Sequence, residues 1–276
     1  MGLKSGGADF FGTLNQMPPE PVAAIAQVLE AMRTEPVFQR ARREMLQLLG
    51  VTAQAMVLDV GCGTGAALPD LVDLAGREVR VTGIDPTEAF LALARERAAR
   101  LGAAGARYER GDARDLPLAS AEYDAAFCDK LLLHVGPPGV VLGEMARVIR
   151  PGGRVGALEW HPYFVISTSS PDLEANFNRI FRQAVYDYMV SANLARYFQA
   201  AGLRDIQTRA YLASTESLDA HPFWRAFLIH QIPLFTHAGL ISEQDGQAFI
   251  TDIEDLNRRG VFRASCVVQI ALGTKP

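Results

Sequence analysis

The sequence predicts an α/β fold built on a doubly wound, mostly parallel sheet. Residues 56–65 form an apolar, strand-like run that leads directly into a loop of alternating glycines. Residues 66–75 then show helical apolar spacing, and strand-like and helix-like stretches alternate regularly from 50 to 160. This alternation is typical of right-handed βαβ crossovers in a parallel sheet. A strand, a glycine turn and a helix in this order predict the entrance to a nucleotide-type site.

Composition narrows the range of functions. The 276 residues are enough to bury a large core in one or two domains, and the hydrophobic fraction of 49% fits a compact fold. The net charge of −4 gives no basic surface for nucleic acid. No apolar run approaches the roughly 20 residues of a membrane span, and the first residues lack a signal-peptide core. The three cysteines fit reduced thiols, so we expect a cytoplasmic protein. Its oligomeric state is left open between monomer and homodimer.

Residues 1–49 are expected to form an N-terminal arm followed by two amphipathic helices. The apolar periodicity places these helices at 21–29 and 36–49, and Gly50 fits the residue after a helix end. The second helix is basic on its polar face, with Arg40, Arg42 and Arg43. Phe10 and Phe11 allow two interpretations, a hydrophobic staple onto the next helix or a lid over a ligand.

Residues 50–160 are expected to form the ligand-binding core. Strands are predicted at 56–60, 80–85, 106–109, 123–129 and 154–160, with helices at 66–75, 86–101 and 140–149. Residues 161–276 depart from this alternation. They predict helical cap insertions at 171–202 and 219–256, both rich in aromatic residues, and terminal strands at 202–213 and 261–273.

The glycine loop is compatible with two classes of ligand. Gly61, Gly63 and Ala66 satisfy the loose fingerprint of dinucleotide-binding folds, which would make the protein a nicotinamide-dependent oxidoreductase. Asp59, two residues before the first glycine, would repel a phosphate and suits a ligand that carries positive charge.

The run Leu-Asp-Val-Gly-Cys-Gly-Thr-Gly at 58–65 resembles the glycine motif of class I S-adenosylmethionine (SAM) dependent methyltransferases. Asp85, Gly-Asp-Ala at 111–113 and Arg-Pro-Gly-Gly at 150–153 follow in the order and spacing of that family, so the resemblance covers over half of the chain. It is closest to methyltransferases of quinone biosynthesis and natural products. It implies a Rossmann-like, seven-stranded sheet with one antiparallel strand, SAM as the cofactor and S-adenosylhomocysteine as the product.

The resemblance also implies roles for individual residues. Asp59 would face the ammonium of the cofactor, and Asp85 would accept from the ribose hydroxyls. Asp112 would accept from the adenine amino group. The cofactor-binding set is completed by Gly61, Cys62, Gly63, Pro86, Thr87, Ala113, Cys128 and Lys130. Each carboxylate also has a structural interpretation, as a cap of loop N–H groups for Asp59, a helix N-cap for Asp85 and a turn residue for Asp112.

Methyl transfer from a sulfonium depends mainly on holding the reacting atoms in line, and a base is needed only if the acceptor must lose a proton. His134 and His161 follow predicted strands at the edge where open sheets bind ligands, so they are the candidate catalytic residues. No histidine–carboxylate spacing is typical of a metal site.

The aromatic residues of the cap allow two interpretations, the core of the cap or the wall of an acceptor pocket. As a wall, with His161, Tyr163, Phe181, Tyr186, Trp224 and Phe227, they favour a small, mostly apolar or aromatic acceptor that is methylated on oxygen or carbon. The alternative is a SAM-binding protein of the same fold that catalyses a non-methylating, cyclase-like reaction or acts as a regulatory binder.

Overall fold

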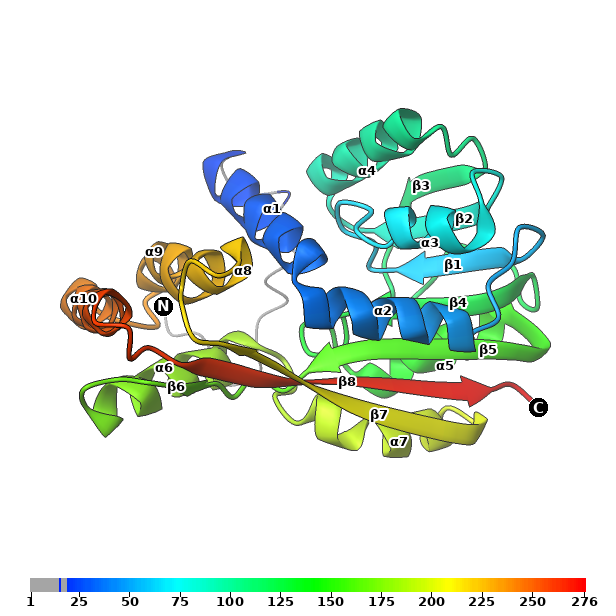
Figure 1. Ribbon diagram of the computed structural model, residues 1–276. Helices are drawn as coiled ribbons and strands as arrows, with labels where there is room; N and C mark the ends of the chain where they lie inside the picture. The colour runs from blue at the N-terminus through cyan, green and yellow to red at the C-terminus, as the bar shows by residue number, and fades with distance from the viewer. Residues whose placement is uncertain (1–14, 16–18) are drawn as a thin grey trace.

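The computed structural model describes residue 15 and residues 19–276, and its architecture is α/β (Figure 1). One sheet of eight strands runs through the described chain in the order β3-β2-β1-β4-β5-β8-β6, and β7 also pairs with β8. The predicted fold class is therefore confirmed. Phe10 and Phe11 lie outside the described residues.

The parallel half of the sheet corresponds to the predicted ligand-binding core. Its strands are β1 (Met56–Val60), β2 (Arg80–Asp85), β3 (Ala106–Arg110), β4 (Tyr123–Asp129) and β5 (Ile149–Trp160). β1 is parallel to β2 on one side and to β4 on the other, so its side chains are buried on both faces. This position explains the apolar run. The loops after β1, β2 and β4 meet at the carboxyl edge of the sheet.

The antiparallel half contains β6 (Val165–Ile166), β7 (Arg204–Thr215) and β8 (Ala264–Thr274). β8 runs antiparallel to β5, β6 and β7, and so it is the reversed strand that the family resemblance implied. The two-residue strand β6 is an addition to the seven predicted strands. It is too short to produce a periodic signal in the sequence.

Two groups of helices pack against this sheet. The first comprises α1 (Pro19–Thr34), α2 (Pro36–Leu48), α3 (Leu68–Ala75), α4 (Glu88–Leu101) and α5 (Pro138–Val148). The second comprises α6 (Pro171–Ala184), α7 (Val190–Ala200), α8 (Pro222–Arg225), the π-helical turn η2 (Ala226–His230), α9 (Ile232–His237) and α10 (Glu243–Arg258). Within this group, α7 packs on β5, β7 and β8 beside α5 and so covers the sheet, and the others form the cap. None of the described helices is long and apolar enough to span a bilayer. The predicted division at 49/50 and 160/161 stays a prediction.

Helix α1 lies between the core and the cap (Figure 1). Val22, Ile25 and Ala26 pack against Phe90 of α4 and Leu234 of α9, in a small cluster separate from the main core. The helix extends beyond the predicted range of 21–29 at both ends. It is followed at once by α2, which Glu35 caps by accepting the backbone N–H groups of residues 37 and 38 at 2.9 and 3.0 Å.

The aromatic side chains of the cap form a packed cluster around the end of β5. The Trp160 ring lies 4.5 Å from that of Phe227 and 5.3 Å from that of Phe164, centroid to centroid. The cluster continues through Phe177, Phe181, Phe223, Phe235 and Phe249. Edge-on and tilted contacts of this kind stabilise an aromatic core, so the cap and the sheet share one hydrophobic interior.

Candidate functional site

The glycine loop after β1 has three residues in the left-handed region, Gly61, Gly63 and Gly65, with φ of +71°, +52° and +71°. A Cβ at Gly61 would lie 2.6 Å from the Leu131 side chain, and one at Gly65 would lie 3.0 Å from the Cβ of Ala94. At Gly63 the nearest protein atom would be a Leu29 methyl at 3.8 Å, an ordinary contact. Packing thus excludes side chains at the outer two positions, whereas the Gly63 backbone faces space that a ligand can use.

Asp85, at the end of β2, is tied to this loop. Its carboxylate accepts the Gly63 N–H at 2.9 Å and the Thr87 N–H at 2.8 Å. Burial raises the pKa of Asp85 and the two backbone donors counteract that rise. The N-cap of α4 is Thr87, so Asp85 does not have the N-cap role that we considered for it. Its carboxylate instead holds the glycine loop, where a ribose contact would require it.

The residues that follow Asp85 meet the N-terminal segment. The Pro86 carbonyl accepts from the Asn15 side chain at 2.6 Å, and the Asn15 amide oxygen accepts the Glu88 N–H at 3.1 Å. Asn15 thus caps α4 from a distant part of the sequence. The Thr87 hydroxyl is buried and has no hydrogen-bond partner in the described part of the chain.

Asp59, on β1, is only 3% exposed, and no described residue forms a hydrogen bond with its carboxylate. Burial raises its pKa well above the usual range, and the charges of Asp129 and Asp85 raise it further. The alternative role of capping loop N–H groups is not observed. A cationic group bound beside Asp59 would favour its ionised form.

Asp112 lies at the partly exposed rim of the site. Its carboxylate accepts the Arg114 backbone N–H at 2.9 Å and the Arg114 guanidinium at 2.7 Å. These hydrogen bonds lower the pKa of Asp112. The geometry is that of a turn aspartate, and contacts of Asp112 and the buried Ala113 with adenine stay a prediction.

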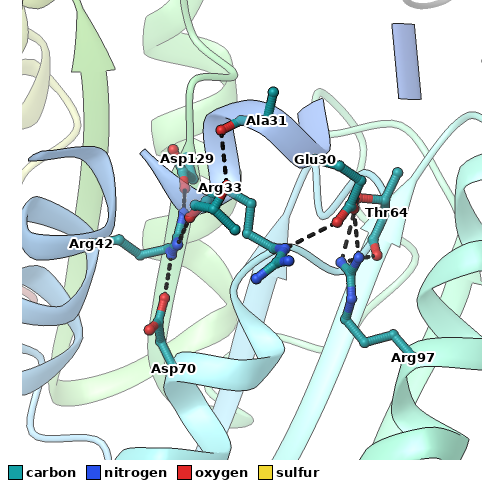
Figure 2. A network of polar contacts seen from close by, with 9 residues as sticks. Glu30, Ala31, Arg33, Arg42, Thr64, Asp70, Arg97 and Asp129 are labelled. Carbon is teal, nitrogen blue, oxygen red and sulfur yellow. Dashed lines mark hydrogen bonds and ion pairs between the residues drawn. The ribbon is translucent and has the colours of Figure 1, made fainter. Parts of the chain in front are cut away.

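A buried arginine connects the end of β4 to three other elements (Figure 2). Arg42, 1% exposed, donates to Asp70 of α3 at 2.7 Å, to Asp129 at 3.2 Å and to the Arg33 carbonyl at the end of α1 at 2.9 Å. Our placement of Arg42 on the polar face of this helix is therefore wrong, because its guanidinium is buried and paired with two carboxylates. The signal in the sequence is that Arg42 falls on the apolar face of α2, between Phe38 and Met45.

A second set of contacts joins α1 to the glycine loop (Figure 2). Glu30 accepts the Thr64 hydroxyl at 2.7 Å and the Arg97 guanidinium at 2.5 Å, and Arg97 also donates to the Thr64 carbonyl at 2.6 Å. Arg33 binds Glu30 at 3.0 Å and so links this set to Arg42. The three charged side chains were not predicted, since no local pattern distinguishes them from surface charges.

The strand β4 ends at Cys128 and Asp129, and Lys130 follows. Cys128 and Cys62 are buried thiols whose pKa values are raised by burial, as expected for residues that fill space. Lys130 has φ of +60°, which is unusual for a residue other than glycine. Its ammonium pairs with the Asp129 carboxylate and lies 5.3 Å from the centre of the Phe38 ring.

The two histidines proposed for catalysis differ in setting. Burial and the nearby Lys130 charge lower the pKa of His134 to about 3, so this side chain is neutral near pH 7. Burial also lowers the pKa of His161, whose backbone N–H donates to the Val267 carbonyl at 2.8 Å. A catalytic role for either side chain stays a prediction.

Glu159 is a titratable group that we had not predicted. It is fully buried on β5 and accepts the Leu132 N–H at 2.6 Å, while its second oxygen has no described partner. Burial raises its pKa to about 8. The residue therefore keeps its proton at neutral pH and holds the turn after Lys130.

The residues expected to line an acceptor pocket do not share one environment. Phe181, Trp224 and Phe227 are at most 4% exposed, within the packed interior of the cap. Tyr163 and Tyr186 are 47% and 42% exposed. The buried three fit the core interpretation, whereas the two exposed tyrosines and the partly exposed His161 are accessible to a molecule from solution.

Comparison with known proteins gives one family match and several relatives. Residues 57–153 match the family described as "Methyltransferase domain". A demethylmenaquinone methyltransferase of Bacillus cytotoxicus is 29% identical over 206 residues, which are 68% of this chain and 87% of the relative. An O-methyltransferase of Pyrenophora dematioidea is 30% identical over 147 residues, 52% of this chain and 53% of the relative.

A solved structure of similar fold is a Haemonchus contortus phosphoethanolamine N-methyltransferase in complex with phosphomonomethylethanolamine and S-adenosylhomocysteine. Its TM-score is 0.61 at 16% identity, over 97% of this chain and 60% of that one. This likeness concerns the fold alone. The chain spans about half the length of several curated relatives that it matches.

Proposed function

We propose that this chain, whose residues 57–153 form a methyltransferase domain of the class I SAM-dependent type, transfers a methyl group from SAM to a small acceptor. The matched domain and the named methyltransferase relatives support the family that the sequence resembles. The acceptor that we propose is mostly apolar or aromatic and is methylated on oxygen or carbon.

The observation that carries the proposal is the chemistry around the glycine loop. Two buried carboxylates, Asp59 and Asp85, lie beside a loop whose Gly63 backbone is open to a ligand. A dinucleotide would bring a pyrophosphate close to Asp59, which repels it. An adenosyl group with a cationic amino-acid end suits both carboxylates, because Asp85 can accept from ribose hydroxyls and Asp59 can face the ammonium.

When bound, SAM would supply an electrophilic methyl group that an acceptor nucleophile attacks in line, with S-adenosylhomocysteine as the leaving group. The residues of this chain then contribute mainly position, which lowers the entropic part of the barrier. The glycine loop and Asp85 hold the adenosyl end, and the backbone after β4 lies where the reacting end would be. His161 is the proposed polar contact for the acceptor. His134 is the second candidate, and its pKa of about 3 makes it a weak base, which favours a contact with the acceptor over proton transfer.

Two features support an apolar or aromatic acceptor. Tyr163, 47% exposed, follows Trp160 closely in sequence and offers an aromatic face to a molecule from solution. Among relatives of this chain are enzymes named for quinones and for O-methylation. Aromatic faces can stack on a ring and attract a sulfonium.

The test begins with calorimetric titration of the purified chain with SAM, S-adenosylhomocysteine and NAD. We expect binding of the first two and none of NAD. Transfer is then followed with SAM labelled in the methyl group, against a panel of phenols and naphthohydroquinones of increasing apolar area. Phosphoethanolamine serves as the polar control.

We expect the methyl label to appear in the organic extract with compounds of the aromatic panel. We expect no transfer of label to phosphoethanolamine. NAD binding without SAM binding would contradict the proposal. The cyclase-like alternative would be favoured if the protein bound SAM and transferred no label, and if a compound of the panel were nevertheless converted to an unmethylated product.

A further inference from the structure

The ammonium of Lys130 is an unusual group for the interior of this protein. Its side chain is 10% exposed and follows directly on β4, at a backbone conformation with φ of +60°. Lysine side chains are rarely buried unless they are paired. The backbone N–H of Lys130 donates to the Leu158 carbonyl at 2.7 Å, and this bond fixes the Lys130 backbone beside β5.

The hydrogen-bonding capacity of this ammonium exceeds what the described residues offer. An ammonium has three N–H donors, and the described residues provide one hydrogen-bond acceptor, the Asp129 carboxylate. The ring of Phe38 lies on another side, 5.3 Å away, and accepts no conventional hydrogen bond. Buried donors without acceptors are costly, so the remaining N–H groups point to a ligand acceptor.

A complementary group lies on the neighbouring strand. Asp59 is a buried acceptor to which no described residue donates, and β1 pairs directly with β4. No ion pair joins Asp59 and Lys130 among the described residues. The Lys130 ammonium and the Asp59 carboxylate therefore lie at the same edge of the sheet, each with hydrogen-bonding capacity that no described residue uses. A zwitterionic ligand could bind to both.

We propose that the Lys130 ammonium binds the carboxylate of the amino-acid end of the cofactor, opposite Asp59, which takes its amino group. This assignment rests on the proposed function. It gives a specific partner on the cofactor to the Lys130 side chain, which we had placed in the cofactor-binding set without assigning its contact. Oxygen atoms of a carboxylate can accept from two of the ammonium donors, and such charged hydrogen bonds are the stronger ones.

The neighbouring arginine supports this arrangement and does not compete for the ligand. Arg42 already donates to Asp70, Asp129 and the Arg33 carbonyl. Its part is to hold Asp129 (Figure 2), and Asp129 in turn accepts from the Lys130 ammonium. Arg42 is thus a positioning residue, and Lys130 is the one that contacts the cofactor.

The test compares two ligands that differ only in the group concerned. S-Adenosylhomocysteine carries the carboxylate, and its decarboxylated form, S-adenosyl-3-thiopropylamine, lacks it. Calorimetry on the unaltered protein should show about tenfold to hundredfold weaker binding of the second ligand. In Lys130→Met the affinity for S-adenosylhomocysteine should fall by a similar factor while that for the decarboxylated ligand changes little. Lys130→Arg should retain part of the discrimination.

Arg40→Met is the matched control, since Arg40 is a basic residue on α2 that faces outward over Tyr211. It should leave both affinities unchanged. Equal affinity of the unaltered protein for the two ligands would overturn the proposal, and this comparison does not depend on any variant folding. Equal losses of both ligands in Lys130→Met would also overturn it. Failure of the unaltered protein to bind S-adenosylhomocysteine would instead contradict the proposed function.

Discussion

Asp85 combines a structural role with its proposed contact to the cofactor ribose. Because it accepts from Gly63 and Thr87, Asp85→Ala removes two backbone contacts as well as the ribose contact. We expect a loss of about 1.5–3 kcal/mol in S-adenosylhomocysteine binding for each charged hydrogen bond removed. Asp85→Asn keeps one acceptor oxygen and should bind more tightly than the alanine variant. Calorimetry showing unchanged affinity in both variants would contradict the ribose assignment.

Glu159 should make the stability of the protein fall with rising pH. Its pKa is about 8 in the fold against 4.5 as the ordinary value. Between these two values the folded protein keeps a proton that the unfolded chain has lost, so raising the pH favours unfolding. Each unit of pKa difference corresponds to about 1.4 kcal/mol.

Glu159→Gln removes the titration and keeps an acceptor for the Leu132 N–H. We therefore expect the stability of the unaltered protein to fall, relative to this variant, from pH 5 to pH 8. Denaturant unfolding of both proteins at the two pH values measures the difference between their free energies of unfolding. If this difference were the same at pH 5 and pH 8, Glu159 would be ionised in the folded protein over that range.

At the scale of elements, α1 joins the glycine loop to the cap and should report on cofactor binding. It is held by Glu30 to Thr64 and Arg97. Its first half packs in a small apolar cluster separate from the main core, and its second half joins the main core through Val28, Ala31 and Met32. The first half of the helix, which lies outside the main core, should open more easily than the sheet. Since Leu29 lies beside Gly63, a ligand at the loop would also meet this helix.

Glu30→Gln should therefore increase hydrogen exchange in α1 and weaken S-adenosylhomocysteine binding severalfold. The ligand should protect the helix in the unaltered protein. Glu20→Gln is the matched control, because Glu20 is an exposed residue in the first turn of the same helix. Equal exchange of α1 in Glu30→Gln, Glu20→Gln and the unaltered protein would show that α1 is simply part of the core.

The same scale shows what the sequence could and could not predict. Strands β1 to β5 and the glycine loop were predictable because each depends on a short, local pattern of apolar residues and glycines. The contact of Arg42 with Asp129 joins residues 87 positions apart, and nothing local to either one indicates the other. The predicted helical segment 171–202 contains a break at 185–189, because Tyr186 and Asp187 donate their backbone N–H groups to the Leu133 carbonyl. Such tertiary contacts override helical periodicity.

For the whole molecule, the decisive question is whether the cap aromatics belong to the core or to an acceptor wall. Phe227 is 2% exposed, and its ring contacts those of Trp160, Phe164, Phe181 and Phe223 at centroid distances of 4.5–5.4 Å. Because Trp160 belongs to β5, loss of the Phe227 ring leaves a cavity between the sheet and the cap. Phe227→Ala should lower the free energy of unfolding by about 3–5 kcal/mol.

Tyr163 provides the comparison, since it is 47% exposed and adjoins the same cluster in sequence. Tyr163→Ala should change stability by only about 0.5 kcal/mol and should raise KM for an aromatic acceptor without changing SAM affinity. Denaturant unfolding and transfer kinetics on both variants separate the two roles. If Phe227→Ala left stability unchanged and altered only KM, the buried ring would be part of the acceptor wall. The pocket would then extend through the cap to β5, and the closed aromatic interior would have to open for the acceptor to enter.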